Sequence, residues 1–103
     1  MALHSVAQLA DLPPGSALQV VVDGRQIGIF NCGGAIYAAD NVCTHAYAEL
    51  HEGYIDSDDC SIECPLHGAR FDLASGRVLS LPASVPLQVY RVSVEDETIL
   101  VEL

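Results

Sequence analysis

The chain has 103 residues, half of them hydrophobic, and its four cations, all arginines, face 14 carboxylates for a formal net charge of −10. This length suits one domain with a modest core, and the hydrophobic content excludes a disordered chain. The negative charge excludes nucleic acid and anionic membranes as partners, because both are bound through positive side chains. It favours high solubility and a basic protein partner.

The N-terminal segment, residues 1–12, lacks the basic flank and the unbroken apolar run of a signal peptide. Apolar runs elsewhere have the length of strands and are too short to span a membrane. We therefore expect a soluble protein of the cytoplasm. In that compartment, four cysteines favour metal binding over disulfides.

Strand patterns dominate the chain, and no window keeps a helical period. Residues 17–31 contain two β-rich runs around Asp23 and Gly24, a pair typical of hairpin turns. Residues 31–40 predict a second hairpin around two consecutive glycines. One helical turn is expected within residues 5–15. Shorter or alternating patterns predict strands at residues 61–64, 69–72, 76–80, 87–94 and 98–103.

These elements predict an all-β sandwich or barrel built from residues 1–39 and 76–103. Residues 40–75 are then an insertion into this frame. The insertion contains both cysteine–histidine pairs of the chain, on two loops that flank a hairpin. Such a placement suits a site held between two loops.

Cys43 and His45 form a C-x-H pattern, and Cys64 and His67 form C-x-x-H. Thiolate and imidazole are ligands of soft and borderline metals. A chance grouping and a tetrahedral zinc site are two interpretations, but zinc sites usually open with two cysteines two to four residues apart. The third is a dinuclear iron cluster. If both cysteines bind one iron and both histidines bind the other, each loop crosses both irons and must carry one ligand of each kind.

The paired motif, ending in C-P-L-H-G, resembles that of Rieske [2Fe–2S] proteins, in which two histidines replace two cysteines on one iron. Residues 43–53 and 64–83 are similar throughout to Rieske-type ferredoxins of bacterial aromatic-ring dioxygenases, as are residues 10–15 and 85–103. The resemblance implies a Rieske-type antiparallel β-sandwich or barrel with an inserted two-loop cluster-binding subdomain. It also implies one [2Fe–2S] cluster per chain, with the four ligands Cys43, His45, Cys64 and His67.

The same resemblance implies a one-electron carrier and not an enzyme. Its partners would be a flavin-containing NAD(P)H reductase, which supplies the electron, and a terminal oxygenase, which uses it with O₂ to hydroxylate an aromatic ring. The carrier would act as a monomer. Two alternatives stay open: the small Rieske-like subunit of an assimilatory nitrite reductase, and an iron–sulfur redox sensor.

The chain departs from the high-potential Rieske proteins of respiration and photosynthesis. Those proteins join the two loops by a disulfide, whereas the matching positions here are Ala48 and Leu66. They also donate hydrogen bonds to the cluster from a serine and a tyrosine, whereas Ala69 and Phe71 stand at those positions. Hydrogen bonds to the sulfurs raise the potential, so these departures indicate the low-potential branch.

The remaining candidates lie outside the motif. Cys32 and Cys60 would form a second metal site or a redox disulfide, but we expect two separate thiols. We expect His51 to be a surface residue, since it lacks the motif's spacing, and His4 has no partner in sequence. The acidic run within residues 49–63 is either a solvated face or a surface that steers a basic partner.

Overall fold

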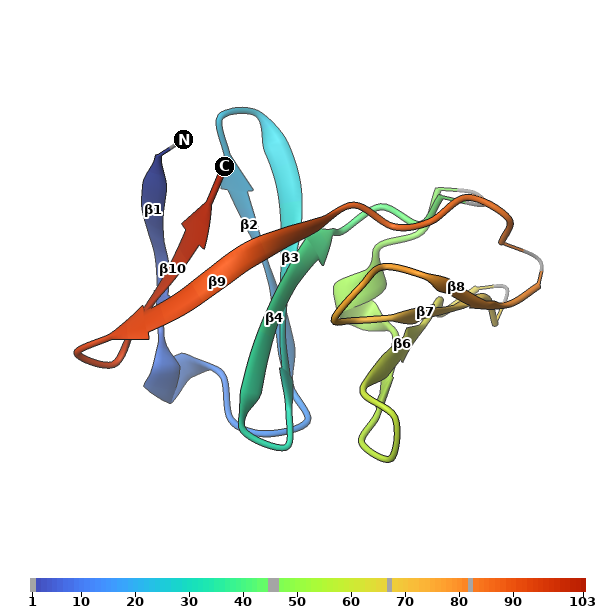
Figure 1. The fold of residues 1–103 in the computed structure, drawn as a ribbon, viewed down its shortest axis with the longest axis horizontal. Coiled ribbons are helices and arrows are strands. Elements are labelled where there is room, and N and C mark those ends of the chain that lie inside the picture. Colours follow the sequence, from blue (N-terminus) through green and yellow to red (C-terminus); the bar gives the residue numbers. More distant parts are fainter. Residues whose placement is uncertain (1, 45–46, 67, 82) are drawn as a thin grey trace.

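The computed structural model describes residues 2–44, 47–66, 68–81 and 83–103, which form two antiparallel sheets (Figure 1). The large sheet has the order β1 (Leu3–Gln8), β10 (Thr98–Glu102), β9 (Val89–Glu95), β4 (Ala35–Asp40), β3 (Arg25–Cys32) and β2 (Ala17–Val22). The small sheet has the order β5 (Tyr54–Asp56), β6 (Ser61–Glu63), β7 (Arg70–Asp72) and β8 (Val78–Ser80). Two short 3-10 turns, η1 (Leu9–Asp11) and η2 (Leu50–Glu52), complete the elements. The expected all-β fold is confirmed.

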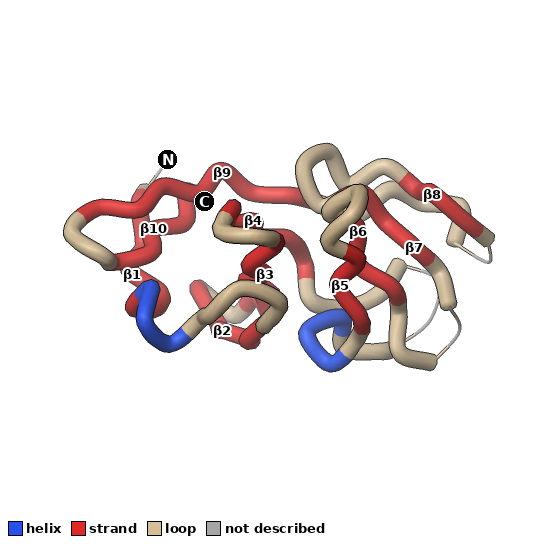
Figure 2. Tube along the Cα trace, turned by 90° about the horizontal axis from the view of Figure 1, so that it is seen from below, coloured by secondary structure: helices blue, strands red, loops and turns tan. Residues whose placement is uncertain are grey.

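The large sheet curls toward a barrel (Figure 2), and its hairpins lie where the sequence predicts them. In the β2–β3 turn, Asp23 and Gly24 both adopt positive φ, at 50° and 81°. In the β9–β10 turn, Asp96 and Glu97 do the same, at 49° and 65°. Two consecutive left-handed residues give a turn whose twist matches that of the flanking strands.

Three elements differ from the expectation. Residues 3–8 form strand β1, which pairs with β10, so the helical turn expected within residues 5–15 is limited to η1. Strand β5 was not predicted. Strand β8 pairs with β7 and belongs to the small sheet, although the sequence placed residues 76–80 in the outer frame. In each case the strand is fixed by a partner that its own short sequence does not indicate.

Two apolar cores stabilise the molecule. One lies within the large sheet and includes Ile27, Ile29 and Val101. The other joins the end of the large sheet to the small sheet, and Phe30 and Phe71 are fully buried in it. Since this second core contains residues of both sheets, it sets the position of the small sheet and its loops.

A disulfide between Cys32 and Cys60 links the two sheets, with their Cα atoms 5.7 Å apart. The expectation of two separate thiols was therefore wrong. Cys32 ends β3, and Cys60 ends the turn between β5 and β6. Their meeting depends on how the small sheet packs against β3, which no local pattern at either cysteine indicates.

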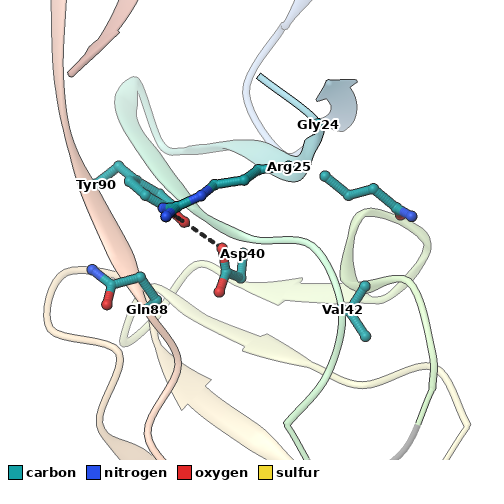
Figure 3. A pocket seen from close by; sticks show the side chains of 7 residues that line it. Gly24, Arg25, Asp40, Val42, Gln88 and Tyr90 are labelled. Atoms are coloured by element: carbon teal, nitrogen blue, oxygen red, sulfur yellow. Dashed lines mark hydrogen bonds between the residues drawn. The ribbon is translucent and has the colours of Figure 1, made fainter. Parts of the chain in front are cut away.

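The main chain passes between the sheets twice, and the two passages run side by side (Figure 1). The amide of Asp40 donates to the carbonyl of Gln88 at 2.9 Å. Close by, the Tyr90 hydroxyl donates to the Asp40 carboxylate and accepts from Arg25 (Figure 3). Desolvation, and then the bond to Asp40, raise the pKa of Tyr90. We call residues 40–41 and 87–88 the crossing.

No helix in the described ranges is long and apolar enough to cross a membrane.

Gly76 ends the tight turn after β7, and its amide and carbonyl bond to Asp72 and Leu87. It has φ +78°, and a Cβ there would overlap the carbonyl oxygen of Leu87. Gly15 provides a matched control, because it has φ +85° with nothing within 4 Å of its Cβ position. We expect Gly15→Ala to cost about 1–2 kcal/mol for the left-handed backbone. Gly76→Ala should cost about 1–3 kcal/mol more, because the backbone must also shift.

The measurement is urea unfolding of the holoprotein followed by circular dichroism. Equal losses in the two variants would show that the chain accommodates the Gly76 overlap without a cost.

Candidate metal centre

Two loops of matching construction lie at the end of the molecule away from the termini (Figure 1). We call residues 43–48 finger 1 and residues 64–69 finger 2. The amide of Cys43 donates to the carbonyl of Ala48 at 2.9 Å, and the amide of Cys64 donates to that of Ala69 at 2.7 Å. In each finger a backbone hydrogen bond thus joins the first residue to the last. The first residue is the predicted cysteine ligand. Both cysteines are buried.

The predicted histidine ligands, His45 and His67, lie outside the described residues. Among the residues that are described, no three His, Cys, Asp or Glu side chains lie close enough together to hold a metal ion. The assignment of the four ligands therefore stays a prediction.

Each finger begins and ends on paired backbone. Val42 and Glu49 form a bridge directly outside finger 1, and Glu63 and Arg70 are paired in β6 and β7 directly outside finger 2. Gly68 has φ +74°, a conformation that glycine adopts without steric cost. Short loops closed in this way hold the two cysteines on rigid strand ends.

A third loop, residues 81–86, is bonded to finger 1. The Thr44 hydroxyl donates to the carbonyl of Val85 at 2.7 Å. On the other side, the hydroxyl of Ser80, which ends β8, lies 3.4 Å from the carbonyl of Gly68 in finger 2. The strand before the loop and the loop itself therefore contact both fingers. Pro82 of this loop lies outside the described residues.

The three loops carry large exposed apolar side chains. Tyr47 of finger 1 and Leu66 of finger 2 are each 66% exposed, and Leu81 and Val85 of the third loop are 83% and 56% exposed. We call these four residues the apolar tip. Exposed apolar groups gathered on neighbouring loops are typical of an interaction site.

Asn41 supports finger 1 from beneath and was missed by the sequence analysis. It is fully buried, and its Oδ1 accepts the amide hydrogen of His51 at 2.8 Å. Its Nδ2 lies 2.8 Å from Nδ1 of His51, which must accept, because an amide nitrogen only donates. His51 is thus a structural partner of Asn41, and the expectation of a plain surface residue was wrong.

The acidic run is partly neutralised by a cation from outside it. Arg70 lies 2.7 Å from Asp59 and 3.5 Å from Asp56. The Ser61 hydroxyl lowers the pKa of Asp59, desolvation opposes it, and Arg70 lowers it further. By contrast, Glu52 and Asp58 are exposed to solvent.

The model of the Rieske [2Fe–2S] domain family matches residues 2–91 of the chain. The chain belongs to the Rieske family. The ferredoxin subunit of 3-phenylpropionate/cinnamic acid dioxygenase from Escherichia coli strain K12 is 44% identical over 95 residues, which are 92% of this chain and 88% of that protein. The expected resemblance is therefore confirmed.

Solved structures agree with this assignment. The ferredoxin of carbazole 1,9a-dioxygenase from Nocardioides aromaticivorans IC177 is 38% identical, with a TM-score of 0.93 over 98% of this chain and 97% of that one. The ferredoxin chain in a complex of reduced oxygenase and oxidized ferredoxin of carbazole 1,9a-dioxygenase is 35% identical, with a TM-score of 0.88 over 96% and 91%. A putative nitrite reductase small subunit is 24% identical, which shows the fold alone.

This Rieske domain is an electron carrier with one [2Fe–2S] cluster, since its relatives are ferredoxin components and not the oxygenases themselves. Its described residues fit the group: two cysteines, the sulfur ligands such a cluster takes, are buried at the bases of matching loops. Ala69 and Phe71 are fully buried and have no hydroxyl. Ala48 is buried and Leu66 exposed, with no cysteine at either position.

We expect His51→Ala to leave Asn41 Nδ2 buried without its acceptor, at a cost of about 1–3 kcal/mol in unfolding free energy. Because Asn41 lies beneath finger 1, iron should also be lost faster to a chelator. The measurements are urea unfolding and the rate of iron release from the holoprotein. The control is His4→Ala, since His4 makes only a 3.8 Å approach to the exposed Asp23. His4→Ala should change the unfolding free energy by no more than about 0.5 kcal/mol. Equal losses of stability in the two variants would contradict the role of His51.

Proposed function

We propose that this Rieske ferredoxin takes electrons from a flavin-containing NAD(P)H reductase and delivers them, one at a time, to a terminal oxygenase that hydroxylates an aromatic ring. It acts as a monomer in the cytoplasm. The observation that carries this proposal is the arrangement at one end of the molecule: two buried cysteines beneath an exposed apolar tip. Such an end can dock on one partner and then on another.

The small sheet and its fingers are the cluster-binding subdomain of this proposal. Cys43, His45, Cys64 and His67 would hold the cluster, the two cysteines on one iron and the two histidines on the other. When bound, the cluster supplies reversible one-electron oxidation and reduction. The chain has to hold the ligands in place, exclude water from the cysteines and present the histidine side to a partner.

The described residues suit each of these tasks. The backbone bonds that close the fingers fix the backbone positions of Cys43 and Cys64. Both cysteines belong to the apolar core around Phe71, which excludes water from their inner side. Thr44 holds the third loop against finger 1. The apolar tip offers a contact small enough to form and separate quickly, as weak electron-transfer complexes require.

A related ferredoxin, 35% identical, has been solved in a complex with its oxygenase, which supports an oxygenase as one partner of this chain. The nitrite reductase alternative rests on a likeness of fold at 24% identity. No feature of the described residues favours it. We therefore propose the dioxygenase system, in which the small carrier exchanges partners.

The exposed carboxylates of the acidic run give the surface a second task. Arg70 neutralises part of the acidic run, so the free negative charge lies on exposed residues such as Glu52 and Asp58. Charges at a rim raise the rate of encounter more than they tighten the complex. We propose that they steer the ferredoxin toward a basic rim on its partner.

The ligand assignment is tested by replacing each cysteine. Cys43→Ser and Cys64→Ser should abolish the cluster, because each removes a thiolate from the same iron. The control Cys60→Ser should retain it. The measurements are iron and acid-labile sulfide content and the electron paramagnetic resonance spectrum of the reduced protein, with the low average g value of a histidine-ligated centre. Zinc in place of iron after anaerobic purification would overturn the assignment.

Steering is tested by reversing exposed charges of the acidic run. Glu52→Lys with Asp58→Lys should slow reductase-to-ferredoxin electron transfer by about threefold at low salt and flatten its decline with ionic strength. The matched control, Glu95→Lys with Glu97→Lys, changes the net charge equally at the β9–β10 turn, at the other end of the molecule (Figure 1). Stopped-flow kinetics measure both. Equal slowing of electron transfer by the two double variants would contradict steering by the acidic run, because net charge alone would then explain the effect.

A further inference from the structure

The disulfide lies on the side of the sheet–sheet interface opposite the crossing. In Figure 1 the two chain passages are at the upper side of the interface. The β3–β4 turn, next to Cys32, and the β5–β6 turn, next to Cys60, are both at the lower side. The peptide chain therefore joins the sheets along one edge only. The disulfide adds a covalent link at the opposite edge, where it can oppose a rotation about the crossing.

The outer side of the crossing is polar. A polar pocket opens there, lined by Arg25, Asp40, Gln88 and Tyr90 among others (Figure 3). Gln88 is exposed, whereas Asn41 and Leu87 of the crossing are buried, so the crossing is polar on its outer side and holds the sheets together on its inner side. The apolar core shared by the sheets includes Leu87 of the crossing, and it extends to Leu50 of η2.

Cys60 is held in an unfavourable conformation. Its φ is +51°, in the left-handed region that residues with a Cβ seldom adopt. Two contacts keep it there: the bond to Cys32, and the carbonyl of Cys60 accepting the amide hydrogen of Leu73 at 3.0 Å. Strained residues persist only where their surroundings over-determine them. Opening of the disulfide would remove one of the two constraints and let the β5–β6 turn relax.

The two cysteines of the disulfide differ in exposure. Cys32 is buried within the core that joins the sheets, whereas Cys60 is half-buried and lies at the end of a surface turn. A small thiol can therefore reach the disulfide from the Cys60 side, with Cys32 as the leaving group.

We propose that the Cys32–Cys60 disulfide is a thiol-reversible clamp that locks the small sheet, with its two fingers, against the large sheet. The oxidant and reductant are a low-molecular-weight thiol–disulfide couple such as glutathione. A thiolate attacks the sulfur of Cys60 and releases Cys32 as a thiolate, which takes a proton. A second thiolate then releases Cys60, which is protonated in turn. Two thiols supply two electrons and two protons and leave as one disulfide.

Closing of the clamp fixes the fingers on the frame of the large sheet. Opening loosens the β5–β6 side of the small sheet from β3, while the crossing, with Asn41 and Leu87 buried, keeps the sheets together. Because the cluster ligands of the proposed function do not include Cys32 or Cys60, the clamp can open without removal of the cluster. The two proposals can therefore fail separately.

The experiment uses the holoprotein, purified aerobically and then equilibrated without oxygen in glutathione buffers from fully oxidised to fully reduced. Alkylation and mass spectrometry count the thiols in each buffer. Hydrogen exchange then compares the two end states. We expect the disulfide to convert completely across the series, and amides of β5 and β6 to exchange roughly tenfold faster in the reduced form. Amides of β9 and β10 should be unchanged.

The double variant Cys32→Ser with Cys60→Ser is the control. It should retain the visible spectrum of the cluster, show the fast exchange of β5 and β6 in every buffer, and respond to no thiol. A disulfide that never forms, or one that stays closed in the most reducing buffer, would overturn the proposal. So would exchange that is unchanged on reduction, or that rises equally in β9 and β10, since the disulfide would then be a staple of the whole fold.

Discussion

A backbone hydrogen bond between the first and the last residue of each finger organises the functional end of the molecule. The bond from Cys43 to Ala48 and the bond from Cys64 to Ala69 close two loops of different sequence in the same way. The four bonded residues are buried. This single constraint places a cysteine at each base and exposes Tyr47 and Leu66 above. Burial of the predicted cysteine ligands and exposure of the two apolar side chains thus have one cause.

The fingers can be so short because the residues beneath them are fully satisfied. Asn41 uses its side-chain oxygen and nitrogen on the backbone and ring of His51, and its own amide bonds to the carbonyl of Gln26 in β3. Among the described residues, no buried side-chain nitrogen or oxygen lacks a partner. A buried polar network with every member paired specifies one arrangement, because any shift would leave a group unpaired. Finger 1 is therefore fixed to the large sheet at the point where the chain leaves it.

The sequence predicted what depends on local or motif-like patterns. Hairpins at Asp23-Gly24 and Gly33-Gly34 follow from the demand of tight turns for positive φ, and the alternation in residues 98–103 matches buried Ile99 and Val101. The [2Fe–2S] cluster was predictable because the spacing of the two cysteine–histidine pairs is unusual, whereas the assignment of its four ligands stays a prediction. Strand β1, the Asn41–His51 pair and the disulfide were not predictable, since each depends on a partner fixed only by the packing of the sheets. The placement of Arg70 beside the acidic run is a contact of the same kind.

The distribution of charge and apolar surface follows from what a carrier must avoid as well as from what it must bind. A protein with an exposed apolar tip would tend to pair with its own copies through that tip. A net charge of −10 makes each copy repel the next, whereas a partner with a basic rim is attracted. The exposed carboxylates of Glu52 and Asp58 lie close in sequence to the fingers, and Arg70 is held by Asp56 and Asp59 and cannot offset them all. The same charges that keep the tip free in solution would therefore bring it to the correct partner, so solubility and steering need not be competing explanations of the acidic surface.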